Sequence, residues 1–294
     1  MKRFIYKPDK AGKPPLIAFF ISGSGTNYQR IVEANPYVRY IVFTNRPGCE
    51  GARKAAATGH KVIELSHLGY LAGTREKYGI NKVPRNCPER VEFEMHVSKL
   101  LEDACKREPD LICLAGYDQW VTDWLVEKYY PRILNVHPGD TIKGYDGLHW
   151  IPSAKAIIAG DTAVKSTLFL VDKGEDTGPV LLQSRPINIK QTLEGLEAKG
   201  ETGLVQELTS LQAFICNNSI TTYREFNALA TSSQKEAMKT ICQRVQDELK
   251  MQGDWEIYPF AVHELIARGR VEVDGRAIYI DGKKQPETGY KIPG

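Results

Sequence analysis

One stretch near the start of the chain decides the predicted fold: Leu16-Ile17-Ala18-Phe19-Phe20-Ile21-Ser22-Gly23-Ser24-Gly25-Thr26-Asn27. Its first six residues are all apolar, which is typical of a strand buried on both faces of a parallel sheet. The Gly/Ser turn then leads into a helix expected over residues 28–34. A strand, a glycine-rich turn and a helix start together form an anion site, because backbone N–H groups and the helix dipole point to the same place. The alternative is that Thr26 or Asn27 only caps the helix.

The strand-and-helix pattern repeats along the chain. We expect strands over 38–44, 62–65, 110–115, 132–136 and 166–171, and one further strand over 180–183 and 186–189 with a Pro-containing kink. Helices are expected over 51–59, 90–107, 124–130, 151–159, 233–251 and 257–267. Strands that alternate with helices predict an α/β fold, here a Rossmann-like, mostly parallel sheet flanked by helices. Asp274-Gly275 lies between two short apolar runs and predicts a small β-hairpin within a C-terminal extension.

Composition bounds the classes of protein and partner that fit. The 294 residues are 42% hydrophobic with a formal net charge of +3, too small to imply a nucleic-acid or membrane-surface partner. The six cysteines form no CxxC pair or metal-ligand spacing, which favours reduced thiols in the cytoplasm. No run reaches the roughly 18 apolar residues of a membrane helix, and no signal-peptide core follows the basic start. We therefore expect a cytoplasmic protein with small-molecule partners, as a monomer or homodimer.

A second stretch, Leu134-Asn135-Val136-His137-Pro138, carries the candidate chemistry. It follows an apolar run, so it reads as a buried strand that presents an amide and an imidazole at its carboxyl end, where ligands of open α/β sheets bind. An Asn can donate to a developing oxyanion, and a His can transfer a proton near neutral pH. The alternative is a core histidine whose ring bonds a neighbouring carbonyl.

The order of the motifs resembles the 10-formyltetrahydrofolate-dependent formyltransferases, most closely the glycinamide ribonucleotide (phosphoribosylglycinamide) formyltransferases of purine synthesis. The matching motifs are Ile21-Ser22-Gly23-Ser24-Gly25-Thr26-Asn27, Leu114-Ala115-Gly116-Tyr117, Leu134-Asn135-Val136-His137-Pro138, Gly147-Leu148-His149, Asp176-Thr177-Gly178-Pro179-Val180, Ile257-Tyr258-Pro259 and Tyr279-Ile280-Asp281-Gly282. They run in the family's order from residue 16 to about residue 290. Each motif alone is unspecific, and the set is specific.

The resemblance implies roles for individual residues. Asn135, His137 and Asp176 would be the catalytic group, although Asp176 also fits a plain turn residue. Gly25, Thr26 and Asn27 would bind the substrate phosphate, and Arg90 and Asp254 other parts of the substrate, although Arg90 also fits a solvated residue at a helix start. Tyr117, Gln119, Trp120, Val121 and Asp140 would contact folate. The co-substrate would be 10-formyltetrahydrofolate, with no metal.

The resemblance also implies the domain organisation. We expect one formyltransferase domain over residues 1–294, with a phosphate-binding half at 16–136 and a folate and catalytic half at 137–294. Residues 190–235 are polar with few apolar anchors, and read as an inserted or mobile excursion. The segment 66–88 is also longer than the family needs and looks irregular.

The chain departs from the family pattern at several places near the substrate clefts. Gly139-Asp140-Thr141 replaces a Ser-Leu-Leu-like stretch, Asp118-Gln119 replaces Met-Arg, and Phe169 stands where a histidine is expected. These departures leave formyl transfer as the expectation but open the identity of the amine that accepts the formyl group.

Other functions remain as alternatives. The first is a related formyltransferase that acts on another phosphorylated or sugar-nucleotide amine, and a second is a non-catalytic folate- or nucleotide-binding protein. Two other enzymes of the family are disfavoured by architecture. A methionyl-tRNA formyltransferase would add a C-terminal barrel, and a formyltetrahydrofolate hydrolase would add an N-terminal regulatory domain. A nicotinamide dehydrogenase fits poorly, because Tyr28 stands where the third glycine of its fingerprint belongs.

Overall fold

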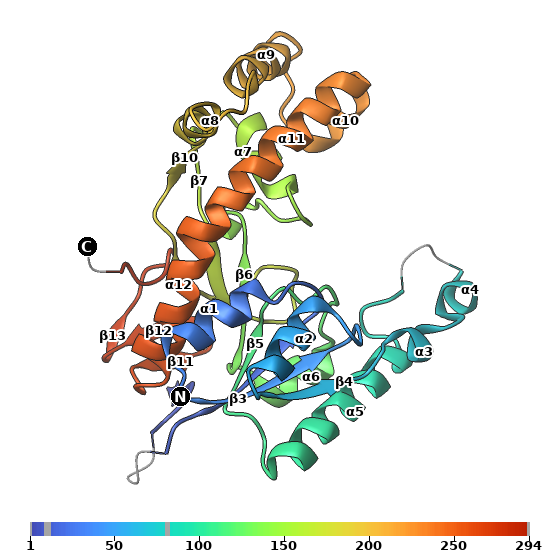
Figure 1. The fold of residues 1–294 in the computed structure, drawn as a ribbon, viewed down its shortest axis with the longest axis vertical. Helices are drawn as coiled ribbons and strands as arrows, with labels where there is room; N and C mark the ends of the chain where they lie inside the picture. Colours follow the sequence, from blue (N-terminus) through green and yellow to red (C-terminus); the bar gives the residue numbers. More distant parts are fainter. Residues whose placement is uncertain (1, 9–12, 80–82, 293–294) are drawn as a thin grey trace. The chain divides into compact units, whose positions relative to one another are not determined.

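A computed structural model describes residues 2–8, 13–79 and 83–292 of the chain. The chain divides into two compact units. The first unit contains the chain up to Val136 together with Phe169–Leu181 and Tyr258–Tyr290. The second unit contains His137–Leu168, Leu182–Ile257 and the chain from Lys291. The secondary structure of both units is drawn in Figure 1.

The central sheet has seven strands. Their order is β4 (Lys61–Glu64), β3 (Arg39–Thr44), β2 (Leu16–Ile21), β5 (Leu111–Leu114), β6 (Ile133–His137), β8 (Thr167–Leu170) and β9 (Val180–Gln183). The pairings from β4 to β6 are all parallel, and β2 lies between β3 and β5. Strands β8 and β9 run antiparallel, because Leu170 bonds Pro179 while Ser184 bonds Ser166. The predicted mostly parallel α/β sheet is confirmed.

Helices of the first unit bury apolar side chains against this sheet. They include α1 (Thr26–Ala34), α2 (Glu50–Ala57), α5 (Pro88–Cys105) and α6 (Asp123–Tyr129). One core gathers Phe20 and Phe43 from the sheet with Phe93 and Leu101 from α5, and the rings of Phe20 and Phe43 meet edge to face at 4.9 Å. The segment expected to be irregular contains two short helices, α3 (Leu68–Leu71) and α4 (Thr74–Tyr78).

The C-terminal hairpin is also confirmed. Strands β11 (Val271–Asp274) and β12 (Ala277–Ile280) pair antiparallel around a turn in which Gly275 has a φ of 60°. They belong to a four-stranded sheet with β1 (Arg3–Phe4) and β13 (Lys283–Lys284). Before the hairpin, the chain forms α12 (Trp255–Phe260) and a π-helical turn, Ala261–Ile266. Among the helices in the described residues, none combines the length and apolar character that crossing a membrane requires.

The expectation of few apolar anchors over residues 190–235 is wrong. The segment folds as α8 (Ile189–Glu197), α9 (Leu204–Asn217) and α10 (Tyr223–Leu229), followed by the long helix α11 (Ser232–Leu249). Together with α7 (Ile151–Ile158), these helices enclose a core that includes Leu193, Leu208, Leu211, Phe226 and Met238. The apolar residues recur three or four positions apart, so one face of each helix is buried although the composition is polar. In Figure 1, α11 is the long orange helix.

Smaller elements complete the second unit. The run predicted as a strand over 186–189 contains only β10 (Ile187–Asn188), which pairs with β7 (Ala163–Val164) in a separate two-stranded sheet. Asn188 then caps α8, because its side chain accepts a hydrogen bond from the backbone N–H of Gln191. The helix begins where the predicted strand was expected to continue.

A substitution in α10 tests whether this segment is packed. Phe226 is 1% exposed, so Phe226→Ala should lower the free energy of unfolding by about 3 to 5 kcal/mol. Leu229→Ala, in the same helix at 56% exposure, is the matched control and should change it by less than about 1 kcal/mol. Urea unfolding measures both. Equal, small effects would show that the segment is the loose excursion that its composition suggested.

Candidate active site

The glycine turn is a close backbone contact between two helix starts. Gly25 has a φ of 67° and stands at the N-cap of α1, without a side-chain cap, so neither Thr26 nor Asn27 caps this helix. A Cβ on Gly25 would lie 2.8 Å from the Cα of Gly51 in α2, and the N–H of Gly51 donates to the carbonyl of Gly23 at 2.9 Å. The first turn of α1 carries no acidic residue, and its backbone N–H groups lack intrahelical acceptors. The turn therefore has the geometry of an anion site.

A polar network at the ends of β2, β3 and β5 surrounds Asp118. Its Oδ1 accepts hydrogen bonds from Ser22 Oγ at 2.9 Å, Asn45 Nδ2 at 2.9 Å and Gln119 Nε2 at 3.0 Å. Its Oδ2 forms an ion pair with Arg46. Burial raises the pKa of Asp118, but these hydrogen bonds and the guanidinium outweigh it, so the pKa is lowered. Asn45 and Arg46 were not among the predicted site residues, although both directly follow a predicted strand.

The loop after β5, predicted to contact folate, is partly core. The ring of Tyr117 packs on Phe20 at 5.4 Å, whereas Trp120 is 42% exposed. Val121 is buried in the core of the first unit, and its carbonyl accepts a hydrogen bond from Arg85 Nε at 2.8 Å. The side chain of Val121 therefore packs in the core, and a contact of this residue with folate stays a prediction.

Arg90 lies with residues of this loop. It shares a narrow crevice with Phe93, Glu94, Gln119 and Trp120, and its Nη1 donates to Gln119 Oε1 at 3.3 Å. Its Nε is buried and has no hydrogen-bond partner among the described residues. The structure thus brings the predicted substrate arginine together with three residues predicted to bind folate, Tyr117, Gln119 and Trp120. A buried donor without an acceptor is costly, so it fits a group that receives a ligand.

Glu94 forms hydrogen bonds with the C-terminal end of the loop after β5. Its carboxylate accepts the backbone N–H of Thr122 at 2.9 and 3.1 Å and also the Thr122 hydroxyl. Thr122 in turn caps α6. Burial raises the pKa of Glu94 to about 7, although the bonds from Thr122 and the charges of Arg90 and Arg85 lower it in part.

This buried carboxyl predicts a pH dependence of stability. Because the folded-state pKa of about 7 exceeds the ordinary 4.5, folding favours the protonated form. The contribution of Glu94 is fully present below pH 4.5 and is lost as the pH rises through about 7. Between pH 5 and 8 this loss is about 2 to 3 kcal/mol. Over that pH range, the free energy of unfolding of the Glu94→Gln variant should therefore fall by about 2 to 3 kcal/mol less than that of the wild type.

Urea unfolding at both pH values measures the effect. Glu92→Gln, at an exposed position of the same helix, is the matched control and should follow the wild type. Identical pH dependence in the wild type and Glu94→Gln would contradict the assignment.

Strand β6 carries two of the predicted catalytic residues, Asn135 and His137, two positions apart and so on one face of the strand. Asn135 is half-buried and belongs to the first unit. His137, in the second unit, is 5% exposed, and its Nε2 bonds the carbonyl oxygen of Tyr145 at 2.8 Å. Since a carbonyl only accepts, Nε2 carries the proton, and Nδ1 is protonated only in the imidazolium. The histidine does bond a neighbouring carbonyl, and that bond selects its tautomer.

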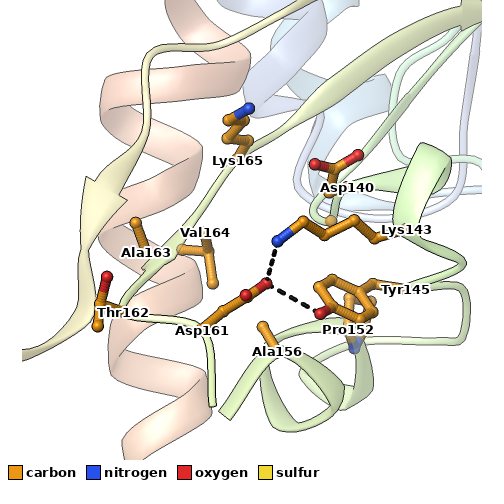
Figure 2. Close-up of a pocket in the computed structure, with 11 residues that line it drawn as sticks. Asp140, Lys143, Tyr145, Pro152, Ala156, Asp161, Thr162, Ala163, Val164 and Lys165 are labelled. Carbon is orange, nitrogen blue, oxygen red and sulfur yellow. Dashed lines mark hydrogen bonds and ion pairs between the residues drawn. The ribbon is translucent and has the colours of Figure 1, made fainter. Parts of the chain in front are cut away.

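A cavity of about 180 Å³ lies beside Tyr145 in the second unit. In Figure 2, Asp161 lies between Lys143 and Tyr145 and accepts hydrogen bonds from Lys143 Nζ at 2.7 Å and from the Tyr145 hydroxyl at 2.9 Å. Asp140, predicted to contact folate, also lines it, caps the following 3₁₀ turn (Thr141–Lys143) and accepts Gln183 Nε2 at 2.8 Å. Tyr145 is therefore held at its hydroxyl, while its carbonyl orients His137.

Asp176 lies in the loop between β8 and β9. It is half-buried and has a φ of 51°, an uncommon backbone conformation for a residue other than glycine. Asp172 shapes the loop, because its Oδ1 accepts the N–H of Gly174 and the hydroxyl of Thr177 at 2.9 and 2.8 Å. A Cβ on Gly178 would lie 1.7 Å from the carbonyl oxygen of Leu170. The loop therefore requires glycine at this position.

Gly178→Ala tests that requirement. The clash falls on the backbone of β8, so the variant should shift the loop and lower the free energy of unfolding by about 1 to 3 kcal/mol or more. Gly69→Ala in α3, where nothing lies within 4 Å of the added Cβ, is the matched control and should be neutral or slightly stabilising. Thermal unfolding of both variants gives the comparison. A Gly178→Ala variant as stable as the wild type would refute the close approach.

Asp254, predicted to contact the substrate, is buried. It is 5% exposed at the end of a π-helical turn, Lys250–Asp254, and its Oδ1 accepts the hydroxyl of buried Ser166 at 2.5 Å. Gly253 packs beside it on Ser166 and Ser184. The predicted contact of Asp254 with the substrate stays a prediction.

The described residues hold no group of three or more His, Cys, Asp or Glu side chains arranged for a metal ion. All six cysteines are free thiols. A comparison with known protein families matches residues 16–208 to the formyl transferase family. The chain belongs to this family. The resemblance that the sequence motifs indicated is confirmed.

Curated relatives differ in how much of their length the chain covers. The trifunctional purine biosynthetic protein adenosine-3 of Drosophila melanogaster is 27% identical over 57% of this chain, and the chain spans only 11% of that protein. The phosphoribosylglycinamide formyltransferase of Haemophilus influenzae is 24% identical over 93% of this chain and 97% of its own length.

Solved structures show the same fold. The phosphoribosylglycinamide formyltransferase of Coxiella burnetii superposes with a TM-score of 0.60 at 22% identity, over 95% of this chain and 100% of the other. Glycinamide ribonucleotide transformylase 1 of Symbiobacterium toebii gives 0.59 at 23% identity, over 92% and 95%. At such identities the likeness concerns the fold.

Proposed function

We propose that this protein transfers a formyl group from 10-formyltetrahydrofolate to the amine of glycinamide ribonucleotide. The observation that carries the proposal is the combination of membership in the formyl transferase family with a glycine turn whose backbone has the geometry of an anion site. The bacterial relative that matches almost the whole chain is named for formyl transfer to phosphoribosylglycinamide. A phosphorylated acceptor fits a turn built from backbone N–H groups.

The residues on β6 supply what the chemistry requires. The acceptor amine attacks the formyl carbon, forming a C–N bond and placing negative charge on the formyl oxygen. In this proposal the Asn135 amide donates to that oxyanion, as does the Nδ1–H of the His137 imidazolium. In this proposal the reacting proton is assigned to Nδ1 of His137, because Nε2 bonds the Tyr145 carbonyl.

Proton transfer completes the reaction. We assign Asp176 to accept the proton of the attacking amine. The oxyanion collapses, the bond from the formyl carbon to N10 of the folate breaks, and N10 takes up a proton. The products are the formamide and tetrahydrofolate.

Binding of the two substrates divides between the elements described above. The backbone at Gly25, Thr26 and Asn27 would hold the phosphate. Folate would lie along the loop after β5, where exposed Trp120 offers an aromatic face and the orphaned Nε of Arg90 a donor for an anionic group. The Asp118-Gln119 pair in this loop departs from the family pattern, so a different phosphorylated amine is the second candidate acceptor.

Release of tetrahydrofolate tests the proposal. Purified protein is mixed with 10-formyltetrahydrofolate and a panel of amines that includes glycinamide ribonucleotide, which should give the highest kcat/KM. His137→Ala and Asp176→Asn should lose at least about 100-fold in kcat while still binding a phosphate ligand. Preference for another amine would move the assignment to that acceptor, and no turnover with any amine would refute formyl transfer.

Matched controls separate catalysis from folding. His96→Ala and Asp103→Asn remove a histidine and an aspartate exposed on α5, and both should keep the wild-type rate. An unchanged rate in His137→Ala or Asp176→Asn would remove that residue from the catalytic group.

A further inference from the structure

We propose that Arg46, positioned by Asp118, is a second phosphate-binding group that gives this protein its preference for phosphorylated acceptors. The inference rests on the proposed function, since it concerns the phosphate of the same acceptor. It assigns a purpose to Asp118, the residue at which the loop after β5 departs from the family pattern. It also adds a cationic side chain to a site otherwise built from backbone N–H groups.

The hydrogen bonds of Asp118 place Arg46 beside the glycine turn. Ser22, the first residue of the turn, donates to Oδ1 of Asp118 and receives the Asp118 N–H at its own Oγ, at 2.9 Å in each case. Oδ2 of the same carboxylate pairs with the Arg46 guanidinium. The Asp118 carboxylate thus lies between the Arg46 guanidinium and the glycine turn. Asn45, which follows β3, also donates to Oδ1 of Asp118 through its Nδ2.

The backbone around Arg46 is also fixed. Its N–H donates to the Thr44 hydroxyl at 3.1 Å, and its carbonyl accepts the N–H of Cys49 at 3.1 Å. The segment then enters α2, where the N–H of Gly51 bonds the Gly23 carbonyl of the turn. Both ends of the segment that carries Arg46 are therefore connected by hydrogen bonds to the glycine turn.

Arg46 keeps donors available for a ligand. Its side chain is 60% exposed and pairs with Asp118 through Nη2. A guanidinium has five N–H donors in a planar fork, so it can hold a carboxylate on one edge and a phosphate oxygen on another. Without Arg46, the Asp118 carboxylate would stand beside the phosphate uncompensated and repel it. The pair therefore converts an unfavourable charge into a preorganised phosphate contact.

A comparison of phosphorylated and unphosphorylated ligands tests the inference. Calorimetry measures binding of ribose 5-phosphate and of ribose to the full chain, and steady-state kinetics compares glycinamide ribonucleotide with its dephosphorylated ribonucleoside. Arg46→Gln should weaken ribose 5-phosphate binding and raise KM for the ribonucleotide, each by about 10- to 100-fold, with kcat nearly unchanged. The same variant should leave KM for the ribonucleoside unchanged.

Three further variants make the test specific. Arg53→Gln removes an exposed arginine of α2 that bonds the Gly48 carbonyl, and should leave phosphate binding as in the wild type. The double variant Arg46→Gln/Asp118→Asn removes the carboxylate charge as well. Its phosphate affinity should stay below that of Asp118→Asn alone, which shows that the guanidinium itself contributes. Arg46→Lys keeps the charge without the fork, and should recover part of the affinity.

The outcomes distinguish this inference from the proposed function. Arg46-dependent binding of ribose 5-phosphate without any formyl transfer would refute only the proposed function. Formyl transfer with an Arg46→Gln variant that binds ribose 5-phosphate as the wild type does would refute only the inference. Equal losses in Arg46→Gln and Arg53→Gln, or an equal rise of KM for both acceptors, would also overturn it.

Discussion

Pairing of β2 between β3 and β5 is the constraint on which the candidate site of the first unit depends. All six residues of β2 are buried, so the strand cannot shift register without exposing apolar side chains. This pairing brings three strand ends to one edge of the sheet, where Ser22, Asn45 and Asp118 exchange hydrogen bonds. The glycine turn, the segment before α2 and the loop after β5 are thereby held as one polar surface.

Much of the fold could be predicted because its signals are local. The continuous apolar runs gave β2 and β6 with few errors at their ends, and Asp274-Gly275 gave the hairpin. The order of short motifs gave the family, which the match over residues 16–208 confirms. The packed helices of residues 190–235 were not predicted, because each has only a few apolar residues on its buried face. Leu204, Leu208 and Leu211 lie on one buried side of α9 among polar residues that dominate the composition.

The contacts of the site could not be predicted, since they join residues far apart in the sequence. Asp118 lies 96 residues from Ser22 in the sequence. From the sequence alone, Asp118 was only a departure from the family pattern, because its hydrogen-bond partners could not be predicted. The place of Val121 in the core of the first unit was likewise not predicted. The bond between the Tyr145 carbonyl and His137 was anticipated only as a generic possibility, and it selects the tautomer in which Nε2 carries the proton.

The fate of the formyl group tests the central claim most directly. Single-turnover reactions with 10-formyltetrahydrofolate carrying ¹³C in the formyl group, followed by NMR, show where the carbon goes. The account predicts that the label appears as a formamide on glycinamide ribonucleotide, in a one-to-one ratio with tetrahydrofolate. Label recovered as free formate, or retained on the folate while the ribonucleotide is bound, would contradict it.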